Sequence, residues 1–241
     1  MADADSAPLL LQLPDTCLLA VLQCLADDAA SLCSASRAHS KLHQAGVMAL
    51  SSISKKVRTR QQLGDSLLPY LTAHGQHVGS IELSCDWNAI TLHQLPPMDQ
   101  LTSLQFKYFK LQLQAGNGFQ GVLGSAGLPL KRLRLESCNL LDGQRGLAIS
   151  LTRLLGMQHL SMQCINTNEY YFIFSTAVLR RLQQLTHLEL NSIGLQYNHR
   201  RKEDPLQPLL ALNRLSSLHL APISSPDLPC SATGAVLSQL S

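Results

Sequence analysis

Leucine recurs along the chain at a spacing that neither a helix nor a strand explains by itself. In the segment LKRLRLESCNL, residues 130–140, leucine occupies the first, fourth, sixth and last positions. A helix repeats its apolar face every 3.6 residues and a strand every 2 residues. The pattern therefore predicts a short strand with alternate leucines pointing inward, followed by a turn that directs Cys138 and Leu140 inward as well.

The same spacing occurs six times. The copies are HVGSIELSCD around Val78, LTSLQFKYFKL from Leu101, LKRLRLESCNL from Leu130, MQHLSMQCINT from Met157, LTHLELNSIGL from Leu185 and LSSLHLAPIS from Leu215. Their starting points lie 23, 29, 27, 28 and 30 residues apart. This periodicity predicts structural units that stack on one another and share one apolar interior.

Four segments between the copies have apolar residues at helical spacing. They are DSLLPYLTAHG (65–75), RGLAISLTRLLG (145–156), STAVLRRLQQ (175–184) and PLQPLLALNR (205–214). We therefore predict an α/β fold, a curved solenoid with parallel strands on the concave side and helices outside. The alternative is an all-helical bundle, which would not place the xxLxL spacing at a near-constant interval.

The repeated pattern resembles the leucine-rich repeat family, whose consensus is LxxLxLxxN/CxL. The copy that begins at Leu130 matches each consensus position, with Cys138 at the N/C position. The resemblance covers residues 65–241 and implies about six repeats. Because the final segment SATGAVLSQLS, residues 231–241, has the pattern of a helix that precedes a further strand, we expect the C-terminal repeat to be incomplete.

A separate helical pattern precedes the repeats. Leu18, Val21, Leu22 and Leu25 lie at positions i, i+3, i+4 and i+7, which share one face of a helix. Three short helices within about 40 residues bury little apolar surface by themselves. We expect an exposed apolar surface in this segment, of the kind that binds a protein partner.

Residues 9–50 resemble the F-box. In that family a leucine-proline pair is followed by a spacer, a leucine, an isoleucine or valine next to a leucine, and a closing leucine. The matching residues are Leu13, Pro14, Leu18, Val21, Leu22 and Leu25. The resemblance implies that these six residues contact the Skp adaptor of a cullin-based SCF ubiquitin ligase, and that the repeats hold an unknown protein substrate. The alternative is that the helices form an N-terminal cap on a repeat protein that has no role in ubiquitination.

Composition and charge narrow the class of protein. Residues 51–64, which include the basic run KKVRTR, are interpreted as a basic linker. The net charge of +3 and the aromatic content of 5% do not favour nucleic-acid binding. The seven cysteines include no CxxC pair, which favours free thiols in a reducing compartment, the cytoplasm or the nucleus. No apolar run approaches 18 residues, so we expect no membrane-spanning helix.

The outward positions of the predicted strands are polar. One row contains Ser80, Ser103, Arg132, His159, His187 and Ser217, and the next contains Glu82, Gln105, Arg134, Ser161, Glu189 and His219. We interpret this face as the substrate-binding surface, carried by Arg132, Arg134, His159, His187, Glu189 and His219. Arginine suits a carboxylate or a phosphate, and histidine titrates near neutral pH. The alternative is an ordinary solvated sheet face.

The sequence gives little support for catalysis or for a metal site. It contains no Gly-rich phosphate loop, no GxSxG motif and no HExxH motif. His159 and His187 have no carboxylate or cysteine at ligand spacing, and the HSKLH segment, residues 39–43, lacks the glutamate of HExxH. We therefore expect a binding protein without cofactor, metal or enzymatic activity.

Overall fold

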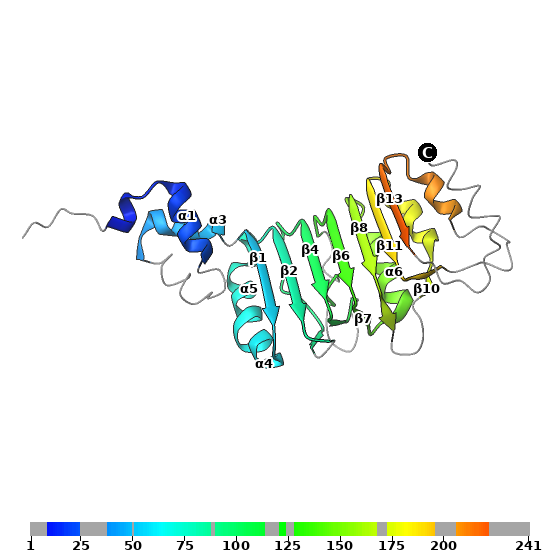
Figure 1. The fold of residues 1–241 in the computed structure, drawn as a ribbon, viewed down its shortest axis with the longest axis horizontal. Helices are drawn as coiled ribbons and strands as arrows, with labels where there is room; N and C mark the ends of the chain where they lie inside the picture. Colours follow the sequence, from blue (N-terminus) through cyan, green and yellow to red (C-terminus); the bar gives the residue numbers. More distant parts are fainter. Residues whose placement is uncertain are drawn as a thin grey trace, which may run out of the picture.

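Seven parallel strands form the main sheet of the protein. The computed structural model describes residues 9–24, 38–49, 51–87, 90–113, 121–123, 128–167, 173–195 and 206–221. The seven strands are β1 (Ser52–Val57), β2 (Ser80–Cys85), β4 (Ser103–Lys107), β6 (Arg132–Glu136), β8 (His159–Gln163), β11 (His187–Asn191) and β13 (Ser217–Ala221). They lie side by side in sequence order (Figure 1), so each connection returns the chain to the next position in the sheet. The fold is α/β with a parallel sheet, as the spacing predicts.

Shorter strands form smaller parallel sheets. A four-stranded sheet contains β3 (Thr91–Leu92), β5 (Lys110–Leu111), β7 (Asn139–Leu140) and β9 (Asn166–Thr167). A two-stranded sheet contains β10 (Ile173–Phe174) and β12 (Gly194–Leu195). Leu111 and Leu140 are fully buried in these strands. Both are at the last leucine position of the repeated pattern, and the sequence predicts that Leu140 points inward.

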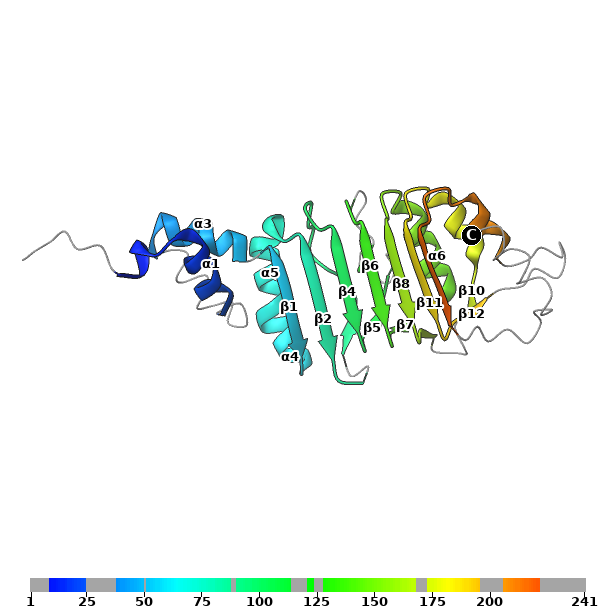
Figure 2. The same ribbon diagram turned by 45° about the horizontal axis from the view of Figure 1, so that its top comes forward.

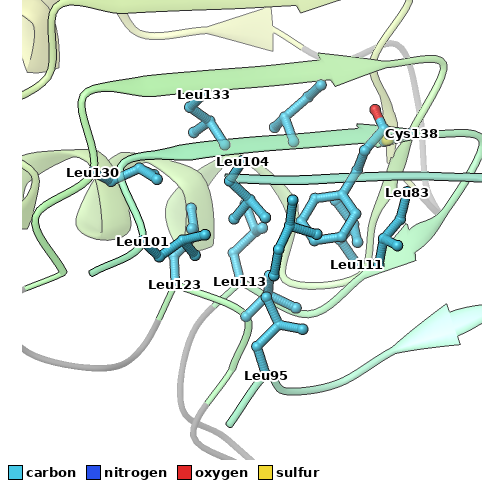
Figure 3. Packing of buried hydrophobic residues seen from close by; sticks show 14 of the residues in the cluster. Leu83, Leu95, Leu101, Leu104, Leu111, Leu113, Leu123, Leu130, Leu133 and Cys138 are labelled. Carbon is cyan, nitrogen blue, oxygen red and sulfur yellow. Dashed lines mark hydrogen bonds between the residues drawn. The ribbon is translucent and has the colours of Figure 1, made fainter. Parts of the chain in front are cut away.

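The inward side chains of neighbouring strands lie directly beside one another. Leu104 of β4 is paired with Leu133 of β6, and Leu133 is paired with Leu160 of β8. Each of the three has about 1% of its surface exposed. Figure 3 shows Leu104, Leu133 and Cys138 packed in one interior with the leucines that follow the strands. The apolar interior is therefore continuous from one unit to the next.

A left-handed residue breaks the strand period after each inner strand. Trp87, Tyr108, Ser137, Cys164 and Ser192 have φ values between 46° and 63°. This conformation costs a non-glycine residue about 1 kcal/mol or more, so the surrounding structure has to hold it. For four of the five, the backbone N–H donates to the last carbonyl of the next strand, as in the bond from Tyr108 to Glu136 at 2.9 Å. The turn directs the following side chain inward, and Cys138 is fully buried as predicted.

Helices cover one face of the sheet, and the other face is open. Arg60 to His77 form a continuous helical segment composed of α4 (Arg60–Gln62), η2 (Leu63–Leu67), α5 (Leu68–His74) and η3 (Gly75–His77). A second α-helix, α6 (Gly143–Arg153), lies between β7 and β8. In two orientations α5 and α6 lie behind the strands, and no described helix lies in front of them (Figures 1 and 2). This arrangement leaves the outward side chains of the strands accessible.

Two of the four predicted helices are 3-10 turns and not α-helices. They are η4 (Thr176–Arg181) and η5 (Gln207–Ala211). A 3-10 turn rises about 2.0 Å per residue, against about 1.5 Å in an α-helix, so it spans a given distance with fewer residues. In η5, Pro208 near the start fixes the backbone and provides no N–H donor. Leu179 and Leu209 are nevertheless fully buried.

The predicted basic linker is wrong in part. Ser52–Val57, inside the range 51–64, form β1 and pair with β2, and Arg60 already belongs to the first helical segment. Ile53 and Val57 point inward, but the half-buried Lys55 stands between them. A lysine at an inward position obscures the alternation of apolar and polar residues that marks a strand, because lysine is read as a polar residue. Its aliphatic stem can nevertheless cover apolar surface.

The N-terminal helices lie beyond the β1 end of the sheet (Figure 1). The described elements there are η1 (Leu9–Gln12), α1 (Asp15–Cys24) and α3 (Ser40–Ala49). Leu18 and Leu22 of α1 are buried, as are Leu42 and Ala45 of α3. None of the described helices is both long and apolar enough to cross a lipid bilayer.

Replacing Leu133 by alanine is expected to lower the free energy of unfolding by about 2–5 kcal/mol, because the cavity opens in the shared interior of three strands. Urea denaturation measures the change. Leu155→Ala is the matched control, because Leu155 is 58% exposed and truncation there should change stability by about 0.5 kcal/mol or less. Equal effects of the two substitutions would contradict the inward position of Leu133.

Cys138 is expected to resist alkylation while Cys164 reacts. Burial raises the pKa of the Cys138 thiol to about 12, whereas Cys164 is exposed on its left-handed turn. The thiolate is the reactive form, and it is scarce for Cys138 at about pH 8. Peptide mapping by mass spectrometry after brief treatment with iodoacetamide distinguishes the two sites. Equal labelling of the native protein would show that the Cys138 turn opens readily to solvent.

Candidate functional site: the open face of the sheet

The two polar rows predicted from the sequence are in register in the structure. Strand pairing places Arg132 beside His159 and His159 beside His187. In the second row it places Arg134 beside Ser161, and Ser161 beside Glu189. The first row runs through Ser80, Ser103, Arg132, His159, His187 and Ser217, and the second runs through Glu82, Gln105, Arg134, Ser161, Glu189 and His219. The side chains of each row therefore come from adjacent strands.

These rows line a groove of about 470 Å³ on the open face. Outward side chains from β4, β6, β8, β11 and β13 contribute to it. The groove brings together the six residues that the sequence assigned to substrate binding: Arg132, Arg134, His159, His187, Glu189 and His219. Their role stays a prediction, but their proximity is a structural fact.

Neutral donors hold the carboxylate in the groove. Ser161 Oγ donates a hydrogen bond of 2.7 Å to Glu189 Oε2, and Gln163 Nε2 donates to Glu189 Oε1. Glu82, nearer the β1 end, likewise accepts a bond of 3.1 Å from Gln105 Nε2. Among the described residues, neither Glu82 nor Glu189 forms an ion pair with an arginine of the same rows.

The two arginines of the groove are weakly engaged. Arg132 is exposed and forms no ion pair with another described residue. Arg134 Nη2 lies 3.6 Å from Glu136 Oε2, and its buried Nε has no hydrogen-bond partner in the described part of the chain. Glu136 lies closer to Lys107 Nζ, at 2.5 Å. The guanidinium groups thus keep hydrogen-bonding capacity for an anionic ligand.

His159 and His187 stack face to face in the groove. Their ring centroids are 4.2 Å apart and the ring planes differ by 21°. The pKa of His159 is lowered from its ordinary value, mainly by desolvation and further by the adjacent His187 and Arg132. Burial and neighbouring positive charge both disfavour the imidazolium form. In the free protein the His159 ring is therefore biased toward its neutral form.

Sequence reasoning missed a third outward row. It includes Ser84, Lys107, Glu136, Gln163 and Asn191, which pair in register at the ends of the strands. Gln163 holds Glu189, and Glu136 lies between Lys107 and Arg134. Extending the strand alternation by two residues would have found these positions, but the sequence does not reveal which of them pair.

An aromatic pair, the exposed Trp87 and the half-buried Tyr108, borders the third row and was also missed. Trp87 is 85% exposed and stacks on Tyr108 with a centroid distance of 5.7 Å. Lys107 Nζ lies 5.2 Å from the Tyr108 ring centroid. In the aromatic segment EYYFIF, residues 169–174, Phe174 is buried and residues 169–172 lie outside the described residues.

The F-box-like residues have unequal exposure. Leu18 and Leu22 are buried, with 0% and 2% of their surface exposed, whereas Val21 is 41% exposed and Pro14 is exposed. Leu13 is half-buried, and Leu25 lies outside the described residues. In the free chain, a partner that binds this segment can reach Val21 and Pro14 directly, while Leu18 and Leu22 hold α1 in place.

Lys41 joins the two N-terminal helices, a contact that the apolar pattern did not predict. Its Nζ donates hydrogen bonds to the carbonyl oxygens of Leu11 at 3.1 Å and Leu13 at 2.8 Å, and lies 3.5 Å from Asp15 Oδ1. The lysine on α3 thus fixes the backbone just before α1. This contact positions Pro14 and the exposed face of α1.

Chemically, the groove is suited to holding an anionic group. Guanidinium and imidazole N–H groups donate to carboxylate or phosphate oxygens. Within the described residues there is no group of three or more histidine, cysteine, aspartate or glutamate side chains that could hold a metal ion.

Comparison with known proteins does not assign the chain to a family. No protein-family model matches the sequence, and the search of curated proteins returns no match.

His159 is expected to titrate below its ordinary pKa of about 6.5, and replacing Arg132 by glutamine should raise the value. Because the folded state favours the neutral His159 ring, the contribution of this ring to the free energy of unfolding is fully present above its unfolded-state pKa. That contribution is lost as the pH falls through the lower pKa of the folded state. NMR of the imidazole Hε1 signal measures the titration. An Arg153→Gln variant, which removes a charge on α6, should leave it unchanged. An unaltered His159 pKa in Arg132→Gln would contradict the electrostatic contact.

Proposed function

We propose that the chain is a substrate-recognition subunit of an SCF-type ubiquitin ligase, in which an F-box-like segment binds the Skp adaptor and a leucine-rich repeat solenoid binds the target protein. The chain itself carries out no bond chemistry. It raises the local concentration of target lysines near the ubiquitin carrier by holding both partners at once. Such a complex operates in the cytoplasm or the nucleus.

The observation that supports this proposal best is that the chain has two separate surfaces suited to protein binding. One is the polar groove between β4 and β13, and the other is the exposed apolar side of the N-terminal helices. The strands that line the groove and the N-terminal helices lie at different places along the long axis of the molecule (Figure 2). A receptor that bridges a ligase and a target needs two surfaces that can be occupied together.

The groove supports the target-binding part of the proposal. The parallel strands recur at near-constant intervals along the sequence, so the equivalent outward residues of neighbouring strands lie side by side. Together these residues form an extended recognition face. In leucine-rich repeat proteins, which the sequence resembles, the concave strand face has this arrangement. The mixture of Arg132, His159 and Glu189 gives the face chemical specificity beyond general polarity.

The helices support the adaptor-binding part of the proposal. Pro14 and Val21 occupy the F-box-like positions that remain exposed, and Leu10, four residues before Pro14 in the sequence, is 41% exposed. Apolar side chains on a small helical unit are favourable anchors for a protein partner. Leu18 and Leu22 contribute indirectly, by packing α1 on α3.

A repeat scaffold outside the ubiquitin system is the second candidate. The burial of Leu18 and Leu22 favours it, because a helical cap needs those leucines inside and does not need an adaptor. In this case the groove still binds a protein, but the N-terminal helices only shield the β1 end of the sheet.

Adaptor retention by the full chain tests the proposal. Wild-type protein is expected to retain a purified Skp adaptor, and Val21→Asp should weaken retention about tenfold or more, because it places a charge in an apolar contact. Val21 is preferable to the buried leucines as a target, since an exposed position can change without unfolding the helix pair. Biolayer interferometry with immobilised adaptor provides the affinity.

Leu155→Asp is the matched control, because it introduces the same charge at an exposed leucine after α6. It should bind the adaptor like the wild-type chain. If the wild-type chain does not retain the adaptor, the ligase proposal fails and the scaffold remains. Equal retention by Val21→Asp and Leu155→Asp, with circular dichroism unchanged, would show that the helices do not provide the adaptor contact.

A further inference from the structure

The groove on the open face has more positive than negative charge available to a ligand. Arg132 and Arg134 contribute two guanidinium groups, and Glu189 is the carboxylate among the described lining residues. Both Glu189 oxygens already accept hydrogen bonds, from Ser161 and Gln163. An incoming anionic group therefore meets the Arg132 guanidinium, which forms no ion pair with another described residue, and Arg134, whose Nη2 also lies 3.6 Å from Glu136 Oε2.

The donors are arranged in a row across three strands. Strand pairing places Arg132, His159 and His187 at the same level of β6, β8 and β11, with about 4.8 Å between strands. Arg134, two residues further along β6, has a buried Nε without a hydrogen-bond partner among the described residues. A carboxylate above this row can accept from a guanidinium and an imidazole together.

We propose that this groove binds an extended, aspartate- or glutamate-rich segment of a protein, and that the His159–His187 pair takes up a proton when the segment binds. That the segment belongs to a ligase target rests on the proposed function. That it is acidic rests on the side chains that line the groove. The groove crosses β4, β6, β8, β11 and β13. Four steps of about 4.8 Å give roughly 19 Å, which an extended segment of about six residues covers at 3.3 Å per residue.

Proton uptake follows from the charges around the stacked rings. His159 faces Arg132 from β6 and His187 from β11, and the other charged or titratable lining groups are Arg134, Glu189 and His219. In the free protein, desolvation and the neighbouring His187 and Arg132 lower the pKa of His159 and favour its neutral ring. A bound carboxylate adds the opposite charge and favours one imidazolium in the pair, so the pair is more protonated in the complex than in the free chain.

Linkage then fixes the direction of the pH effect. Because the complex holds more protons than the free protein, affinity increases as the pH falls through the pKa of the bound pair. It stops increasing once the free protein is protonated as well. Each unit of difference between the two pKa values corresponds to a tenfold change in affinity between the pH limits.

The experiment measures binding of fluorescent peptides to the full chain by anisotropy, between about pH 5.5 and pH 8, where the peptide carboxylates stay ionised. The probe is a peptide of about ten residues with alternating glutamate and serine, long enough to cross the groove. Its glutamine counterpart is the uncharged control. We expect the glutamate peptide to bind, the glutamine peptide not to bind, and the affinity to rise about tenfold from the high to the low pH limit.

Variants separate the two parts of the inference. Arg132→Gln should weaken binding at every pH, whereas in a His159→Gln, His187→Gln double variant the affinity should no longer rise as the pH falls. Arg153→Gln removes a positive charge from α6 on the covered face and should change neither property. Circular dichroism confirms that each variant is folded.

Three results would overturn the inference. They are equal binding of the glutamate and glutamine peptides, an affinity that does not change with pH, and binding of a phosphoserine peptide without binding of the glutamate peptide. No ligase subunit is present in this assay. Adaptor retention without peptide binding would reject the groove inference alone, and peptide binding without adaptor retention would reject the ligase role alone.

Discussion

The in-register pairing of the seven parallel strands is the constraint on which the rest of the structure depends. Parallel hydrogen bonding fixes each strand against the next, and the alternation of side chains then determines both faces at once. Leu104, Leu133 and Leu160 meet on the inner side because of the same register that brings Arg132, His159 and His187 together outside. A shift of one residue in a single strand would place a leucine in the groove and an arginine or histidine in the interior.

The inner face provides the driving force for this register, and the outer face is free to vary. Burying one leucine is favourable by about 1.5–3 kcal/mol, so a strand with two inward apolar residues strongly prefers one alignment. The outward residues make contacts that add little stability, such as the partly exposed ion pair between Lys107 and Glu136. The chemistry of the groove can therefore be changed through Arg132 or His187 at little cost to the fold.

Much of this architecture could be predicted from the sequence because its signal is repeated. The six copies of the spacing became six strands of the main sheet, and the two outward rows have the predicted neighbours. The pattern does not predict β1, because Lys55 interrupts a single, unrepeated strand. It predicts helices where η4 and η5 form, because apolar spacing does not separate an α-helix from a 3-10 turn. The contacts of Gln163 with Glu189 and of Lys41 with the backbone before α1 depend on side-chain geometry, which no periodicity encodes.

The hydrogen bonds that leave four of the five left-handed turns all run in the same direction along the sheet. Tyr108 donates to the strand that follows it, Ser137 donates to the next, and Cys164 and Ser192 continue the series. Each segment made of one strand and its turn therefore supplies two groups. The last carbonyl of its strand accepts from the turn of the preceding segment, and its own turn N–H donates to the strand of the following segment. Gene duplication of such a segment in frame would leave every turn amide paired, which gives an array of this kind a simple route to lengthen or shorten during evolution.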